Sequence, residues 1–521
     1  MIRPLLTAVV LGCAALPVLA EDRLTILHTN DFHARFEPIN AYDSTCKPED
    51  NAEGKCFGGT ARLISAITAA RDAATAPVIL VDGGDQFQGT LFYTHYKGKL
   101  AAEMMNLLGY DAMTVGNHEF DDGPEVLRAF VDAVEFPVLM SNADLSAEPL
   151  LADKIARSVV IERRGMTVGL IGLTPQNTDE LATPGPNVTF SDPVAAVQTE
   201  VDRLTDAGIT RIIVLSHSGY AVDQRVAQET TGVDVIVGGH SNTYLHPTDP
   251  EAEGPYPTMI GDTAIVQAYA YGKFLGALDV TFDASGKLVS ATGAPQLIDA
   301  GVAEDAGVLA RLAQAAEPLE ELRNKVVAEA ALPIGGDRDA CRTGPCAMGI
   351  AVAEAMLERV RDQGVEIALQ NGGGVRSGID AGPITMGEVL TVLPFQNTLS
   401  TFRVSGAEVL EALENGLSQV EEGAGRFPQV AGIEVVYEPA AAPGSRVRAV
   451  TVAGAPLDPD RLYGMVSNNY LRNGGDGFAV LKGAREAYDF GPDVADVLAE
   501  YFARRIPFIP MVDDRVRTSA E

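Results

Sequence analysis

Five short segments in the first half of the chain carry residue types that bind metal ions, and each follows an apolar run. Carboxylate and carboxamide oxygens together with imidazole nitrogens suit Zn, Mn, Fe or Co, and the absence of cysteine argues against a structural thiolate zinc site. A carboxylate shared by two cations would give a dinuclear centre, which can clamp the attacking and leaving oxygens of a phosphoryl group. The segments are Asp31-Phe32-His33, Gly83-Gly84-Asp85-Gln86, Gly116-Asn117-His118-Glu119, Ser216-His217-Ser218 and Gly239-His240-Ser241-Asn242.

The scarcity of histidine strengthens this interpretation. A single histidine at the end of a strand is more often a structural residue than a ligand. The chain has only seven histidines, however, and these five segments hold four of them. Such a concentration favours a metal centre over scattered structural roles.

The apolar runs that precede the segments predict the elements that position them. Runs at 24–27, 78–81, 168–171, 212–215 and 233–237 are short and rich in β-branched residues. Fully apolar runs of this kind suit strands buried on both faces of an α/β layered fold. In such folds the loops after the strands carry the chemistry. We therefore expect the five segments to converge on one rim.

Changes in composition along the sequence also predict how the chain is divided into domains. Residues 303–325 are rich in Ala, Leu and Glu at nearly helical spacing, and Pro318 should kink or split this helix. A second α/β region with glycine clusters follows it. The predicted organisation is a signal peptide over 1–20, a metal-binding domain over 21–302, a linking helix over 303–325 and a C-terminal domain over 326–521.

The N-terminus has the pattern of an export signal. Arg3 precedes an apolar run that ends in Val18-Leu19-Ala20, a small-residue cleavage pattern. The run is shorter than the ~20 residues of a membrane span. Cys13 faintly resembles a lipoprotein cleavage site, but the apolar stretch before it would be very short. We expect a periplasmic or secreted protein without a stable membrane anchor.

Charge and cysteine content fit that compartment. The chain has 39 basic and 71 acidic residues, a net charge of −32, which argues against binding a nucleic-acid polymer or an anionic membrane. Removal of the signal leaves four cysteines and a charge of −33. Local pairing, Cys46 with Cys56 and Cys341 with Cys346, is the simplest of three connectivities. A zinc site of four cysteines would need CxxC spacings that are absent.

Three of the segments resemble a known family when read at full length. They are Leu24-Thr25-Ile26-Leu27-His28-Thr29-Asn30-Asp31, Gly84-Asp85-Gln86-Phe87-Gln88-Gly89 and Gly116-Asn117-His118-Glu119-Phe120-Asp121. They are similar to the calcineurin-like metallophosphoesterases and, more narrowly, to the 5′-nucleotidase family, over essentially the whole mature chain. The resemblance implies an N-terminal four-layer αββα domain and a C-terminal α/β substrate-binding domain.

The resemblance also implies roles for individual residues of the metal centre. Asp31, His33, Asp85 and Asn242 would hold the first of two divalent ions (Zn, Mn or Co). Asp85 would bridge to the second ion, which Asn117, His217 and His240 would complete. His118 would not be a ligand but a catalytic residue paired with Asp121, which fixes its tautomer and favours the imidazolium. A metal-activated water would attack phosphorus in line. The competing interpretation of His118 and Asp121 is a hydrogen bond at the start of a helix.

In the second region, the resemblance implies a nucleotide site. Phe395 and Tyr470 would sandwich the base, because aromatic faces stack on every base. Asp476 would accept hydrogen bonds from the ribose. Arg376 can contact phosphate in a bidentate manner, and glycines let the backbone approach a ligand. The remaining residues of the predicted site are Arg342, Asn371 and Gly373.

The predicted activity is hydrolysis of nucleoside 5′-monophosphates to nucleoside and phosphate. UDP-sugar or nucleoside diphosphate hydrolysis, 2′,3′-cyclic phosphodiester hydrolysis and thiosulfate ester hydrolysis are the nearest alternatives, and a non-catalytic nucleotide-binding protein is the alternative of a different class. The paired aromatics argue against thiosulfate. Because the metals and the base would bind to different domains, catalysis implies a hinge motion at the linking helix. The oligomeric state is open, since the sequence has no readable interface signal.

Overall fold

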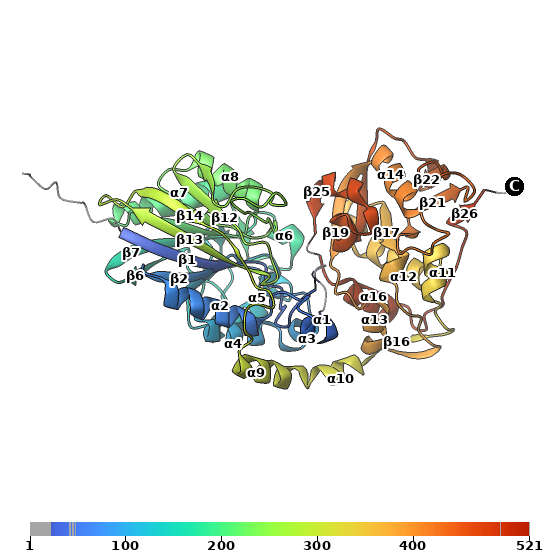
Figure 1. Cartoon of the computed structure of the whole chain (residues 1–521), viewed down its shortest axis with the longest axis horizontal. Helices are drawn as coiled ribbons and strands as arrows, with labels where there is room; N and C mark the ends of the chain where they lie inside the picture. The colour runs from blue at the N-terminus through green and yellow to red at the C-terminus, as the bar shows by residue number, and fades with distance from the viewer. Residues whose placement is uncertain (1–21, 41–42, 44–45, 47, 490, 520–521) are drawn as a thin grey trace, which may run out of the picture.

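The computed structural model describes residues 22–519, apart from 41–42, 44–45, 47 and 490. The predicted signal peptide and Cys13 lie outside the described residues. Figure 1 shows two bodies, one N-terminal and one C-terminal, connected along one side by the helices α9 (Ala306–Ala316) and α10 (Leu319–Arg323).

The N-terminal body contains two large sheets. The first has the order β14-β13-β1-β2-β3-β4, in which β1 to β4 run parallel and β13 is antiparallel to β1. The second has the order β11-β12-β10-β9-β7-β6, with β12, β10, β9 and β7 parallel. The bounds of the first sheet are β14 (Leu288–Gly293), β13 (Phe274–Phe282), β1 (Asp22–Thr29), β2 (Val78–Asp82), β3 (Ala112–Thr114) and β4 (Val138–Leu139), with β15 (Gln296–Leu297) on β13. Those of the second are β11 (Thr258–Ile260), β12 (Thr263–Val266), β10 (Val235–Val237), β9 (Ile212–Ser216), β7 (Met166–Leu173) and β6 (Ser158–Arg163).

The two sheets pack face to face and helices cover their outer faces. Alternate residues of one strand serve two cores, because successive side chains point to opposite faces. Ile26 joins the core between the sheets, whereas Leu27 joins the core beneath α2 (Thr60–Ala73), α4 (Gly98–Leu108) and α5 (Gly123–Ala133). The outer face of the second sheet packs on α7 (Pro193–Asp206) and α8 (Tyr220–Glu229). This is the four-layer αββα arrangement, and the predicted fold class is confirmed.

The linking helix is interrupted at Pro318, as predicted, so that α9 and α10 are separate helices. Val308, Leu312 and Ala315 of α9 are buried in the helix-covered core of the first sheet. Leu319 of α10 joins the same core and Leu322 packs against it, so the N-terminal body contacts the link on both sides of the break.

The C-terminal body is built on a five-stranded sheet of order β20-β17-β24-β19-β25. One face packs on α12 (Ala347–Arg359), α13 (Met386–Val392) and α16 (Val494–Ala503). The other packs on α14 (Gly406–Gly416) and on a small sheet of order β23-β22-β21-β26. The strand bounds are β20 (Pro428–Ala431), β17 (Ile367–Asn371), β24 (Leu462–Asn468), β19 (Leu399–Ser405), β25 (Arg485–Tyr488), β23 (Ala455–Pro456), β22 (Val447–Val452), β21 (Ile433–Tyr437) and β26 (Val516–Thr518).

Shorter elements fill the loops of both bodies. They are α1 (Pro48–Ala52), α3 (Leu91–Tyr96), η1 (His118–Phe120), β5 (Ala143–Asp144), α6 (Thr178–Leu181), β8 (Thr189–Phe190), β16 (Val326–Ala330), α11 (Arg338–Thr343), η2 (Arg361–Gln363), η3 (Gly372–Gly374), β18 (Gly382–Thr385), α15 (Asn469–Arg472), η4 (Gly475–Gly477) and η5 (Ala479–Gly483). Two disulfides, Cys46–Cys56 and Cys341–Cys346, confirm the predicted local pairing. Among the helices described, none is long and apolar enough to cross a membrane.

Candidate metal centre and nucleotide pocket

The five predicted metal-binding segments all follow strands at the carboxyl edges of the two N-terminal sheets. Three come after β1, β2 and β3 of the first sheet, and two after β9 and β10 of the second. Because strands of each set run parallel, their carboxyl ends meet at a common edge. The structure thus brings the segments to one rim, as the sequence predicts.

The backbone of this rim is unusual. Five of the seven predicted ligands have positive φ angles, a region that side chains other than glycine rarely adopt. Such conformations cost about 1–3 kcal/mol each and persist only where the surroundings enforce them. Backbone strain concentrated on these residues indicates a site in which the direction of the side chains matters more than local stability. The five are Asp31 (51°), His33 (52°), Asp85 (59°), His240 (69°) and Asn242 (47°).

Asp85 lies at the centre of the candidate site. Two groups of potential metal ligands, His33 with Asp85 and His118, and Asp85 with His217 and His240, each have their ligand atoms within 4.8 Å of one another. Asp85 Oδ2 is 2.9 Å from His217 Nε2 and 3.9 Å from His33 Nε2. Asp85 belongs to both groups, and a carboxylate that bridges two ions must lie close to the ligands of both.

Backbone carbonyls orient two of the imidazoles. His217 Nδ1 donates to the carbonyl of Gly83 at 2.6 Å, and His33 Nδ1 to that of Phe87 at 3.1 Å. Since a carbonyl only accepts, each ring must carry its proton on Nδ1, and Nε2 is left as the ligand atom. This outer hydrogen bond is the usual support of a metal-binding histidine.

The two asparagines supply the test of whether a metal fits here. The side-chain oxygens of Asn117 and Asn242 are buried and have no hydrogen-bond partner among the residues that the structure describes. A buried carbonyl oxygen without a partner is costly unless something else satisfies it. The combined donor set of carboxylate and amide oxygens and imidazole nitrogens suits a divalent cation.

The pKa shifts of the ionisable side chains also fit a site for divalent cations. Burial lowers the pKa of His33 and His240 to about 3, so that both rings are neutral, as ligation requires. Burial raises the pKa of Asp31 to about 7. Burial alone would lower the pKa of His217, but the neighbouring Asp85 and Asp31 carboxylates raise it to about 10. The carboxylates of Asp31 and Asp85 are thus stabilised by a positive charge placed between them.

His118 and Asp121 form the predicted pair. His118 Nδ1 lies 2.7 Å from Asp121 Oδ2, within the turn that begins at η1. Burial opposes a charge on the ring, but Asp121 and Asp85 outweigh it and raise the pKa of His118 to about 9. The imidazolium is therefore the form expected at neutral pH. Such a group can donate a proton or a charged hydrogen bond.

Glu119 has a role that the sequence analysis missed. Its fully buried carboxylate accepts backbone N–H groups from the loops after both β2 and β3: Oε1 from Gln86 (2.8 Å) and Phe87 (3.2 Å), and Oε2 from Asp85 (3.0 Å) and Gly116 (2.7 Å). Glu119 therefore ties together the loops that carry two predicted ligands. The available signal was an acidic residue adjacent to His118 with no metal role of its own.

All seven predicted substrate residues line one cavity of the C-terminal body. It has a volume of about 260 Å³. Four further residues line it that the sequence analysis did not name: Asn40, Gly374, Asn397 and Gly425. Asn397 lies two residues after Phe395, and Gly425 is held against Gly373, whose N–H donates to its carbonyl at 2.7 Å. The predicted seven are Arg342, Asn371, Gly373, Arg376, Phe395, Tyr470 and Asp476.

Hydrogen bonds fix the polar side of this cavity. The Asp476 carboxylate accepts from Asn371 Nδ2 at 2.8 Å and from the Tyr470 hydroxyl at 3.0 Å. The positively charged guanidinium of Arg376 lies against an aromatic ring: its Cζ is 5.6 Å from the ring centre of Phe395. Phe395 and Tyr470 are both half-buried, so their rings are accessible to a ligand.

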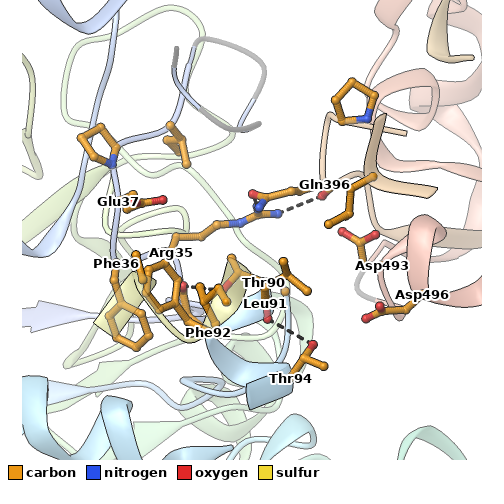
Figure 2. A pocket seen from close by; sticks show the side chains of 18 residues that line it. Arg35, Phe36, Glu37, Thr90, Leu91, Phe92, Thr94, Gln396, Asp493 and Asp496 are labelled. Carbon is orange, nitrogen blue, oxygen red and sulfur yellow. Dashed lines mark hydrogen bonds between the residues drawn. The ribbon is translucent and has the colours of Figure 1, made fainter. Parts of the chain in front are cut away.

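The two bodies contact each other between these sites. Figure 2 shows Arg35 extending from the N-terminal body to Gln396, whose backbone carbonyl accepts from Arg35 Nη2 at 2.9 Å. A cavity of about 660 Å³ is lined by His118 and Asp121 of the N-terminal body and by Thr401 and Tyr488 of the C-terminal body. Tyr488 was not predicted as a site residue, because its sequence context contains no recognisable motif.

Comparisons with known proteins agree with this architecture. The calcineurin-like phosphoesterase family model matches residues 24–244, and the 5′-nucleotidase C-terminal domain model matches residues 326–483. The chain is 37% identical to the 5′-nucleotidase of Diplobatis ommata, over 95% of this chain and 90% of that protein. It is 35% identical to that of Homo sapiens, over 98% and 93%.

Solved structures extend the comparison to the fold. A 5′-nucleotidase precursor from Thermus thermophilus is 39% identical, with a TM-score of 0.60 over 96% of this chain and all of that chain. The NAD nucleotidase of Haemophilus influenzae is 25% identical, with a TM-score of 0.77 over 96% and 100%. The structure with the higher identity thus superposes less completely.

Proposed function

The chain belongs to the 5′-nucleotidase family of metallophosphoesterases, and from that premise we propose that it hydrolyses nucleoside 5′-monophosphates to nucleoside and inorganic phosphate. It is a metal-dependent phosphohydrolase by family and by domain content. The observation that carries the substrate proposal is the cavity at Phe395 and Tyr470, which combines aromatic faces with two arginines and a carboxylate.

The cofactor is a pair of divalent cations, Zn, Mn or Co. Two such ions lower the pKa of a water molecule and neutralise phosphoryl charge when they are bound. Asp85 would be shared by both ions. The first would also be held by Asp31, His33 and Asn242, and the second by Asn117, His217 and His240.

His118 would act on the phosphoryl group and the leaving oxygen. Its Nε2, protonated because Asp121 and Asp85 hold the pKa at about 9, would stabilise developing negative charge or protonate the departing nucleoside oxygen. Asp121 keeps the ring in the required orientation through the 2.7 Å contact with Nδ1.

The C-terminal cavity would hold the nucleotide. Phe395 and Tyr470 would stack on the base, and Asp476 would accept hydrogen bonds from the ribose hydroxyls. Arg342, Asn371, Gly373 and Arg376 would contact the remainder, including the phosphate. This arrangement gives affinity for many bases, because stacking discriminates little between them.

Catalysis would require the two bodies to move. The described lining of the nucleotide cavity includes one residue of the N-terminal body, Asn40, and none of the proposed metal ligands. A hinge motion at the linking helix would bring the phosphate to the metals. A different arrangement of the domains would account for the lower TM-score of the structure with the higher identity. We assign the metal-binding domain to residues 21–302 and the C-terminal domain to 326–521, with the linking helix over 303–325. We also propose that the protein is exported.

The experiment that tests this function is a phosphate-release panel with AMP, thymidine monophosphate, ADP, ATP, UDP-glucose and 2′,3′-cyclic AMP. The monophosphates should give the highest kcat/KM. A preference for UDP-glucose or ADP would replace the proposed substrate by the diphosphate alternative. NAD belongs in the panel because a 25% identical structure is an NAD nucleotidase. No turnover of any compound would favour the non-catalytic alternative.

A further inference from the structure

Tyr488 brings a C-terminal side chain to the proposed catalytic residue of the N-terminal body. Its hydroxyl accepts a hydrogen bond from Asn117 Nδ2 at 3.1 Å and lies 3.2 Å from His118 Nε2. Its ring lies 5.9 Å from that of His240. One phenol therefore contacts the catalytic histidine and two residues proposed as metal ligands.

Local strand geometry directs this side chain to the interface. Tyr488 ends β25, the edge strand of the C-terminal sheet, which Figure 1 places on the side facing the N-terminal body. The pairing of β25 with β19 is irregular between Thr401 and Arg403, and Glu486 has a φ of 50°. Irregularities of this kind at a sheet edge re-aim a side chain.

A second contact close to Tyr488 in the chain also joins the C-terminal body to this rim. Gln88 Nε2, in the loop after β2, donates to the carbonyl of Gly491 at 3.3 Å. Tyr488 and Gly491 thus contact two loops of the proposed metal centre. The nucleotide cavity, in contrast, adjoins the N-terminal body at Asn40.

The atoms that Tyr488 occupies are those that a substrate needs. His118 Nε2 is the atom that would meet the phosphoryl group or the leaving oxygen, and the amide of Asn117 lies beside it. A phenolic oxygen accepting hydrogen bonds at these positions resembles a phosphoryl oxygen in its bonding demands. A phosphate cannot form the same hydrogen bonds until the phenol leaves.

We propose that Tyr488 is an internal competitor of the substrate's phosphoryl group, which occupies His118 Nε2 and Asn117 Nδ2 in the domain arrangement described here and is withdrawn when the nucleotide is delivered. This inference rests on the proposed function for the identity of the substrate. It adds a residue that sets apparent affinity without taking part in the chemistry. A competitor held on the other domain also couples access to the metal centre to the position of that domain.

The test compares Tyr488→Phe with wild type in the metal-loaded, full-length mature protein. The substitution removes only the hydroxyl, so the hydrogen bonds to His118 and Asn117 are lost while the ring remains. Isothermal titration calorimetry with inorganic phosphate should give a Kd lower by about 3- to 10-fold, the value of one typical hydrogen bond. The KM for AMP should fall by a similar factor. Tyr437→Phe, a buried tyrosine in the core of the same body, is the matched control and should match wild type.

An unchanged phosphate Kd in Tyr488→Phe would overturn the proposal. A higher Kd would overturn it too, because the hydroxyl would then be assisting phosphate rather than competing with it. The two proposals fail separately in this design. If wild type releases no phosphate from AMP, the proposed function falls, whereas the phosphate Kd of the two proteins still reports on Tyr488.

Discussion

The metal centre and the nucleotide cavity are built by different means. In the metal centre, Asp31, His33 and Asp85 are at most 2% exposed, have positive φ angles and lie in loops tied to neighbouring backbone. In the cavity, Phe395 and Tyr470 are half-buried and belong to short helices and loops of the other body. The first region is thus buried and tied to neighbouring backbone, whereas the second is partly exposed.

This difference follows from the work assigned to each region. Stabilising charge on a phosphoryl group requires donors already in place, because reorganisation during the reaction would cost part of the gain. Stacking on a base tolerates variation, since every base offers an aromatic face. Variants of the metal centre should therefore change kcat or metal content, and variants of the cavity should mainly change KM.

The largest effect is expected for Asp85→Asn. The shared carboxylate belongs to both potential metal groups, so its loss should remove metal from both positions. Several kcal/mol of transition-state stabilisation would be lost, and kcat should fall on the order of 10³-fold. Metal content per chain and kcat for AMP measure this together. Two retained metals and near-normal turnover would show that Asp85 is not the bridge.

Glu119→Gln should have the next largest effect, although Glu119 is not a proposed ligand. A glutamine side chain presents one amide NH₂ to backbone N–H groups that need an acceptor. The loops after β2 and β3 should then shift, with a loss of roughly 10- to 100-fold in metal affinity. Calorimetric metal titration is the direct measurement. Glu125→Gln, an exposed glutamate at the start of α5, serves as the control. Equal affinities in both variants would remove the positioning role.

Phe395→Ala tests the role of the cavity, because it should weaken nucleotide binding. Base stacking contributes roughly 1–3 kcal/mol, so KM for AMP should rise about tenfold or more. The kcat for p-nitrophenyl phosphate, which has no base, should stay within about twofold. A fall in kcat for both substrates would mean that the cavity residue also organises the metal centre, and the division of labour would be wrong.

The smallest expected effect is a pH dependence confined to the metal centre. His118 is protonated below its raised pKa of about 9, and its donor function is lost as the pH rises through that value. The kcat of wild type should therefore decline on the alkaline side near pH 9. The residual activity of His118→Ala should lack this limb, and Phe395→Ala should retain it. A limb that survives in His118→Ala would belong to another group.

The sequence predicted that the five proposed metal-binding segments meet, because their positions depend on local features. Each proposed ligand follows an apolar strand by a few residues, and parallel strands carry such loops to a common edge. Asp31 and His217 are far apart in the chain, yet their side chains approach to 3.8 Å for this reason. The disulfide Cys341–Cys346 and the helix break at Pro318 were predictable on the same local grounds.

What the sequence did not reveal depends on tertiary geometry. Glu119 acts through four backbone N–H groups that converge only after two loops have folded. Tyr488 reaches His118 through the arrangement of two bodies and an irregular edge strand, and neither leaves a pattern in the residues around it. The packing of α9 into the N-terminal core likewise depends on the neighbouring helices rather than on its own spacing.

The central claim is that a protein-held pair of divalent cations, assisted by His118, removes phosphate from a nucleotide held by the other domain. Phosphate release from AMP before and after treatment with EDTA, and again after addition of Mn²⁺, Co²⁺ or Zn²⁺, tests it most directly. We predict that the chelator abolishes release and that at least one of these ions restores it in wild type. Release that continues unchanged in the metal-free protein would contradict the account.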